Sequence, residues 1–245
     1  MSKIIHAAMS INAGDTDSRN TPFAVNGLEG AIFDMDGTLL DSMSMWSTMG
    51  ERYLRSIGYE PRPGLNDAFR ALSLYQATCY YQREYGVTLS SEELLQGINT
   101  MVEQYYTAEA VLKPGVAEFL EQLHQKGVKM CVATATDHYL VETGLKRCGI
   151  DKYFSQIFTC GIVGHGKDEP IIFREALRHL GTNKSKTLVF EDALHALTTA
   201  KEDGFPVVAV YDAQEKHRDK MLAMADLYIN SFEDTEQFWK FAAAL

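Results

Sequence analysis

The chain has 245 residues, a length that fits one large domain or one domain carrying an insert. With 46% hydrophobic and 23% charged residues, it has the ordinary composition of a protein that builds a full core. The net charge of −10 argues against DNA or RNA as a partner, because nucleic-acid binding usually rests on a basic patch. No apolar run approaches the roughly 20 residues of a membrane span, and the first residues lack the apolar stretch of a signal peptide. We therefore expect a cytoplasmic protein with neither nucleic acid nor membrane as partner; the oligomeric state is open, with a monomer favoured.

The cysteines do not have the spacing of a zinc site. Their simplest interpretation is as free thiols in a reducing compartment, which agrees with a cytoplasmic location. They are Cys79, Cys131, Cys148 and Cys160.

The hydrophobic pattern divides the chain into distinct parts. Residues 1–28 are polar and show no sustained periodicity, which indicates an extension, with a short apolar anchor near residues 23–25. Residues 42–112 have helical periodicity and predict a bundle of about four helices, one of them starting at Ser90. The predicted domains are an N-terminal extension over 1–28, an α/β core over 29–44 and 113–245, and an inserted helical cap over 45–112.

Helical and strand patterns alternate through the predicted core. Such alternation predicts a parallel sheet covered by helices on both faces, so the expected fold is α/β and Rossmann-like, with the helical bundle inserted after the first strand. The predicted strands are 31–33, 128–133, 157–160, 187–190, 206–211 and 227–229. The predicted helices are 116–125, 137–148, 170–180, 193–203 and one at the C-terminus.

Two carboxylates, Asp34 and Asp36, follow the first apolar strand directly and precede Gly37. Carboxylates this close repel each other, so they favour a bound cation or a shared proton. The carboxyl end of a strand in an open parallel sheet is also where ligands bind. The alternative is an ordinary Asp-Gly turn that closes a hairpin.

Polar groups suited to a phosphate follow later strands. Thr134 offers a hydroxyl and nearby backbone amides where a helix starts, although capping by Thr136 or Asp137 explains this stretch equally well. Lys167 ends a glycine-rich stretch and offers a flexible ammonium group that can neutralise a carboxylate and a phosphate. The alternative for Lys167 is a solvated surface lysine.

A second acidic pair, Glu191 and Asp192, ends the predicted strand 187–190. Oxygen ligands from two neighbouring loops are what Mg²⁺ binds, with water completing its coordination shell. A helix start with favourable acidic contacts is the alternative. His195 is expected to be a core or supporting residue, because Mg²⁺ prefers oxygen to nitrogen.

These motifs, in this order and at these separations, resemble those of the haloacid dehalogenase-like superfamily of phosphohydrolases. The resemblance extends over roughly residues 29–230 and is to the subgroup with a helical cap inserted after the first strand. It also implies that the first strand lies between the second strand and the one that ends at Asp192. The motifs that carry it are Asp34-x-Asp36-Gly37-Thr38, Thr134, Lys167 and Glu191-Asp192.

The resemblance implies a phosphoric monoester hydrolase that forms a covalent aspartyl-phosphate. Asp34 would be the nucleophile. Asp36 would protonate the leaving oxygen and then activate water. The expected function is a magnesium-dependent phosphatase for a small phosphorylated metabolite, such as a sugar phosphate.

The resemblance also assigns the binding groups. Thr134 and the amide of Ala135 would hold phosphoryl oxygens, and Lys167 would neutralise charge on the nucleophile and the phosphate. Glu191 would support the metal through water, and Asp36 would contribute its backbone carbonyl. The implied Mg²⁺ site comprises Asp34, Asp36, Glu191 and Asp192.

Two alternatives stay open at this point. A sugar phosphomutase of the β-phosphoglucomutase type would carry a His and an Arg where Trp46 and Leu74 align here, with Arg70 one helical turn away as a substitute. A non-catalytic binding protein would have no need for the acid Asp36. The sequence does not show which residues of the insert face the cleft.

Overall fold

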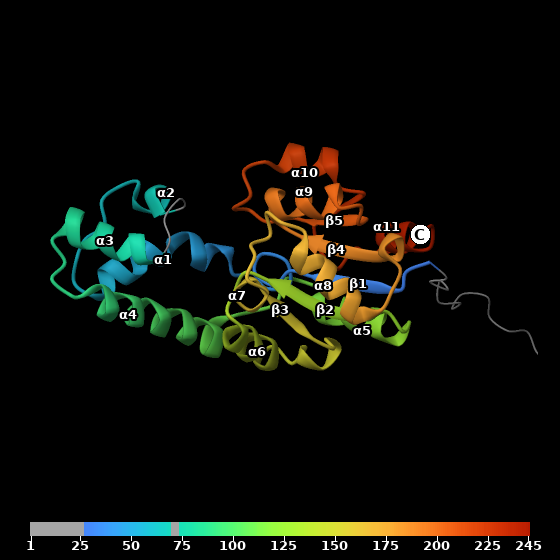
Figure 1. Cartoon of the computed structure of the whole chain (residues 1–245), viewed down its shortest axis with the longest axis horizontal. Helices are drawn as coiled ribbons and strands as arrows, with labels where there is room; N and C mark the ends of the chain where they lie inside the picture. Colours follow the sequence, from blue (N-terminus) through green and yellow to red (C-terminus); the bar gives the residue numbers. More distant parts are fainter. Residues whose placement is uncertain (1–26, 70–73) are drawn as a thin grey trace, which may run out of the picture.

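The computed structural model describes residues 27–69 and 74–245 (Figure 1). The predicted extension, apart from its last two residues, lies outside this part of the chain, as does Arg70. None of the helices in the described part is long and apolar enough to cross a bilayer. The four cysteines, all described, are free thiols.

A parallel sheet forms the centre of the described chain, and its strand order is β3-β2-β1-β4-β5-β6. Strand β1 lies between β2 and β4 and is parallel to both, so the interpretation of the first motif as a hairpin turn is wrong. The chain adds strands on one side of β1 and then on the other, which makes the β1–β4 boundary the place where ligands bind in such sheets. The strands are β1 (Gly30–Phe33), β2 (Lys129–Thr134), β3 (Ile157–Thr159), β4 (Thr187–Glu191), β5 (Val207–Val210) and β6 (Leu227–Ile229).

Helices cover both faces of the sheet because each strand presents apolar side chains alternately to either side. Phe33 belongs to one core cluster, where its ring stacks on Phe190 with the centroids 4.3 Å apart, and Ile32 belongs to the other. The Phe33 face is covered by α5 (Val116–Gln125), α6 (His138–Arg147) and α11 (Glu236–Ala242). The Ile32 face is covered by α8 (Ile171–Leu180), α9 (Leu194–Glu202) and α10 (Arg218–Met224). The predicted α/β fold class is confirmed.

The helical insert projects from one side of the core (Figure 1). Ser90 starts its last helix with a reciprocal capping box to Glu93, which confirms the helix start expected there. The insert consists of α1 (Met43–Ser56), α2 (Leu65–Phe69), α3 (Leu74–Tyr85) and α4 (Ser91–Gln104), followed by a π-helix, η1 (Tyr105–Glu109).

The two segments that join insert and core pair with each other. The amide of Asp41 donates to the carbonyl of Val111 at 3.0 Å, and the amide of Lys113 donates to the carbonyl of Leu39 at 2.9 Å. The pairing ties both ends of the insert together at the edge of the core.

Helix α6 of the core holds η1 in place. The guanidinium of Arg147 donates hydrogen bonds to the carbonyls of Thr107, Ala108 and Ala110. A Cβ atom at Gly144 would lie 3.0 Å from Cδ1 of Tyr106, so the tyrosine ring packs directly on α6. These contacts attach residues 106–110 to the core.

Strand β3 is one residue shorter than predicted. It ends at Thr159 because the hydroxyl of this residue accepts a hydrogen bond from the amide of Ile162 and caps the short helix α7 (Cys160–Val163). Two 3₁₀ turns, η2 (Asp151–Tyr153) and η3 (Lys184–Lys186), complete the described elements.

Candidate active site

A cavity of about 470 Å³ opens at the carboxyl ends of β1, β2 and β4, between the core and the insert. All the residues predicted for the site line it, so the fold gathers motifs that lie far apart in the chain. They are Asp34, Asp36, Thr134, Ala135, Lys167, Glu191 and Asp192.

Lys167 is the ammonium group of this cavity and is only 7% exposed, so the alternative of a surface lysine is wrong. Its Nζ donates to Oδ1 of Asp34 and, at 2.6 Å, to Oε1 of Glu191. Burial alone would lower the pKa of Lys167, but the charges of the two carboxylates outweigh it and raise the pKa. Lys167 is therefore held as a cation against the expected nucleophile.

Three buried carboxylates gather around this lysine. One oxygen each of Asp34, Glu191 and Asp192 lies within 4.8 Å of the others. Burial and mutual repulsion raise the pKa of Asp192 well above its usual value, and burial raises that of Glu191 to about 8. One ammonium cannot balance three carboxylates, and a divalent cation would. The donors are all oxygen, so the group fits Mg²⁺.

Gly37 and Thr38 of the first motif shape the position of Asp192. Gly37 has a φ of 81°, and a Cβ atom there would lie 2.1 Å from Oδ2 of Asp192, so any other side chain would displace the carboxylate. The hydroxyl of Thr38 donates to Oδ1 of Asp192 at 3.3 Å. The small residue and the hydroxyl together bring the β1 loop against the end of β4.

Asp36 lies in the same cavity, but hydroxyl groups hold it instead of a lysine. Its Oδ1 accepts from the hydroxyls of Ser42 and Tyr106, both at 2.6 Å. Its Oδ2 accepts from the hydroxyl of Thr136 at 2.7 Å. The indole Nε1 of Trp46 in turn donates to the Tyr106 hydroxyl at 3.3 Å.

Two of the three predicted phosphate-binding residues, Thr134 and Ala135, lie at the end of β2. Thr134 is 1% exposed, and its hydroxyl accepts from the amide of Thr136 at 3.2 Å. Asp137, at the start of α6, makes no side-chain capping bond. The interpretation of Thr136 and Asp137 as caps is therefore wrong, and Thr136 acts on Asp36 instead.

Residues 31–210 of the chain match the family of haloacid dehalogenase-like hydrolases. The chain belongs to this family. It is 31% identical to a probable pseudouridine-5'-phosphatase of Drosophila melanogaster, over 82% of this chain and 92% of the relative. It is 29% identical to (DL)-glycerol-3-phosphatase 2 of Arabidopsis thaliana, over 88% of this chain and 93% of the relative.

Solved structures agree with this assignment at the level of the fold. A putative β-phosphoglucomutase from Thermotoga maritima superposes with a TM-score of 0.76 at 24% identity, over 87% of this chain and 99% of that one. The expected family, fold class and enzyme class, a phosphoric monoester hydrolase, are therefore confirmed.

The insert of this haloacid dehalogenase-like hydrolase contributes a wall without charge to the cavity. None of its described side chains that line the cavity is ionisable; they are Met43, Trp46, Asn99 and Val102. Trp46 thus faces the cleft at the position where a mutase would carry a His. The side chain of Leu74, the other aligned position, lies outside what the structure describes.

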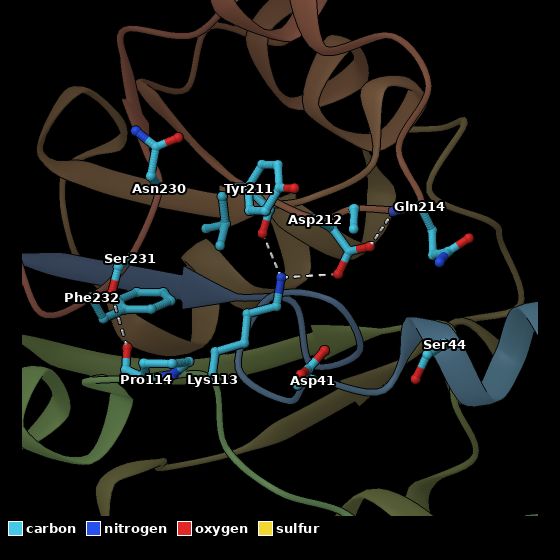
Figure 2. A pocket seen from close by; sticks show the side chains of 12 residues that line it. Asp41, Ser44, Lys113, Pro114, Tyr211, Asp212, Gln214, Asn230, Ser231 and Phe232 are labelled. Atoms are coloured by element: carbon cyan, nitrogen blue, oxygen red, sulfur yellow. Dashed lines mark hydrogen bonds and ion pairs between the residues drawn. The ribbon is translucent and has the colours of Figure 1, made fainter.

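A second, smaller cavity of about 320 Å³ lies at the carboxyl ends of β5 and β6, beside the segments that join core and insert (Figure 2). The ammonium group of Lys113 donates to the carbonyl of Tyr211 at 2.5 Å and to the carboxylate of Asp212 at 3.0 Å (Figure 2). The charge of Asp212 raises the pKa of Asp192, and the charge of Lys113 lowers it. This cavity contains none of the predicted site residues.

Sequence reasoning missed all the hydrogen-bond donors that hold Asp36. Ser42 precedes α1, yet it makes no capping bond with its side chain. Thr136 was open to a capping role, and Tyr106 lies in a stretch read only as helical. Of these donors, only Ser42 has a signal in the sequence, because it follows the acidic end of the first strand closely.

Proposed function

We propose that this hydrolase is a magnesium-dependent phosphatase that releases phosphate from small monoesters with an uncharged leaving group, through an aspartyl-phosphate. The proposal rests on the different surroundings of Asp34 and Asp36, two carboxylates that are separated by one residue. Asp34 is buried against Lys167 and two further carboxylates, whereas the described side chains that donate to Asp36 are all neutral hydroxyl groups. Two carboxylates in different surroundings suit two different chemical roles.

Asp34 is the nucleophile in this proposal. Its carboxylate attacks phosphorus, and the ester oxygen leaves with the electron pair of the broken bond. Lys167 holds one oxygen of Asp34 and neutralises charge on the incoming phosphoryl group. Asp34, Asp192 and the backbone carbonyl of Asp36 would hold Mg²⁺, with Glu191 as a further support, and the bound ion would supply further charge neutralisation.

Asp36 is the general acid and base. It gives a proton to the leaving oxygen, and afterwards takes one from the water that cleaves the aspartyl-phosphate. Thr134 and the amide of Ala135 hold the phosphoryl oxygens, because both line the cavity at the end of β2.

The uncharged insert wall supports a neutral leaving group. Two relatives are named for pseudouridine 5'-phosphate and glycerol 3-phosphate, whose leaving alcohols carry no charge. Others are named pyrophosphatases, whose leaving group is a charged phosphate, so the proposal for a neutral leaving group rests on the described insert wall. A mutase must hold a second phosphate while its aspartyl-phosphate waits. The described wall of Met43, Trp46, Asn99 and Val102 offers no cation for it.

A screen of phosphorylated metabolites for released inorganic phosphate tests the proposal. We expect stoichiometric phosphate from simple monoesters, and Asp34→Asn should lower turnover by about three orders of magnitude or more with the fold intact. A coupled assay with glucose-6-phosphate dehydrogenase should detect no conversion of β-glucose 1-phosphate. Glucose 6-phosphate formed with little free phosphate would instead establish the mutase, and no turnover in the screen would favour the binding protein. A cytoplasmic location and a monomeric state stay predictions.

A further inference from the structure

Tyr106, which belongs to none of the sequence motifs, is in direct contact with Asp36, the proposed general acid and base. It is fully buried, and its hydroxyl donates to Oδ1 of Asp36 at 2.6 Å. The indole of Trp46 donates to the same phenol oxygen at 3.3 Å, which fixes the direction of the hydroxyl.

The hydrogen bonds leave one acceptor position on Asp36 unfilled. A carboxylate offers about two acceptor sites on each oxygen. Among the residues that the structure describes, Oδ1 accepts from Ser42 and Tyr106 and is filled, while Oδ2 accepts from Thr136 alone. The remaining site is on Oδ2, so Oδ2 is the oxygen left to carry a transferable proton.

The support for Tyr106 comes from the core. Its ring packs on α6 at Gly144, and Arg147 of the same helix holds the neighbouring carbonyls of η1. A π-helix places an extra residue in a turn and is found frequently at functional sites. Here it directs Tyr106 toward Asp36 and its neighbour Tyr105 toward the backbone carbonyl of Asp41.

We propose that Tyr106 is a positioning residue that fixes which oxygen of Asp36 transfers the proton; the inference rests on the proposed phosphatase function. During formation of the aspartyl-phosphate, the proton on Oδ2 of Asp36 moves to the ester oxygen. The P–O bond breaks with its electron pair on that oxygen, while a bond forms between phosphorus and Asp34. Without the Tyr106 hydroxyl, the carboxyl group rotates and the proton is presented less often to the leaving oxygen.

Two substrates of similar shape separate this role from a structural one. p-Nitrophenolate leaves without a proton, whereas the phenolate of phenyl phosphate is more basic and benefits from one. The measurement is kcat/KM for both, because this constant includes only the steps up to formation of the aspartyl-phosphate. We expect Tyr106→Phe to lower kcat/KM for phenyl phosphate at least about tenfold more than for p-nitrophenyl phosphate.

The matched control is Tyr105→Phe, which removes the hydroxyl of a buried tyrosine in the same π-helix; that hydroxyl donates to the backbone carbonyl of Asp41 and not to Asp36. It should keep the substrate ratio of the unaltered protein. An equal loss on both substrates in Tyr106→Phe, or the same ratio in both variants, would overturn the inference. The unaltered protein must release phosphate from both substrates and Asp34→Asn from neither; failure there would refute the proposed function, and not the role of Tyr106.

Discussion

The core and insert walls of the cavity differ in almost every physical property. The core wall contains four buried charged side chains, Asp34, Lys167, Glu191 and Asp192, with Lys167 between Asp34 and Glu191. The described insert wall is neutral and partly exposed, and consists of Met43, Trp46, Asn99 and Val102. Buried charges cost stability unless they are paired, so the core wall has little freedom to change. The residues of the insert wall can change at a lower cost in stability, which suits a surface that selects the leaving group.

Metal removal tests the core wall and should have the largest effect. Three buried carboxylates with one lysine lack positive charge, so activity should vanish in EDTA and return with Mg²⁺. Ca²⁺ should inhibit, because its larger and looser coordination shell misplaces the nucleophile. Phosphate release measured against metal concentration checks this, and full activity in EDTA would contradict it.

Lys167→Gln tests the same wall without removing a carboxylate of the expected metal site. Loss of the ammonium leaves Asp34 and Glu191 without their shared partner, and we expect kcat to fall by about 100-fold to 1,000-fold. Lys113→Gln is the matched control, since Lys113 is also a largely buried lysine paired with an aspartate but lies in the neighbouring cavity (Figure 2). It should lower kcat by no more than several-fold, and similar losses in both variants would remove the distinction between the two lysines.

Asn99→Lys alters the insert wall. A cation placed opposite the core should attract substrates that carry a second anionic group. We expect kcat/KM for fructose 1,6-bisphosphate to rise about tenfold relative to that for fructose 6-phosphate, which corresponds to roughly 1.4 kcal/mol. Asn99→Gln keeps the amide and should leave the ratio unchanged. An unchanged ratio in the lysine variant would mean that Asn99 does not face the leaving group.

Arg147→Ala concerns the boundary between the two regions and should have the smallest effect. The guanidinium donates to two carbonyls of η1 and to that of Ala110 just after it, but largely at the surface, so its loss should cost about 1 kcal/mol. Thermal unfolding should then shift down by about 2–4 °C. The neighbouring Lys146→Ala, which breaks only an exposed pair with Glu142, should leave the melting temperature nearly unchanged. Equal shifts would show that η1 does not depend on Arg147.

The sequence predicted the parts of the site that local chemistry determines. Asp34 and Lys167 follow strands or precede helices, and parallel strands bring such ends to one edge. The donors to Asp36 were not predictable in this way. Ser42 and Thr136 look like helix caps, because both lie where a helix begins and capping is the usual use of a hydroxyl there. Tyr106 reaches the site only through a π-helix, which ordinary helical periodicity does not signal.

The anchoring of η1 to α6 has a consequence for protein engineering. Because Arg147 and Gly144 keep residues 105–110 on the core, the junctions for a chimera lie just before Met43 and just after Gln104. A helical segment from a relative grafted between these points would bring new substrate preferences and leave the hydroxyl groups around Asp36 in place. A graft that extended from Met43 to residue 112 would instead replace Tyr106 and exchange catalytic geometry together with specificity. Within this family, the place of the cut would decide whether recombination changes the substrate or the chemistry.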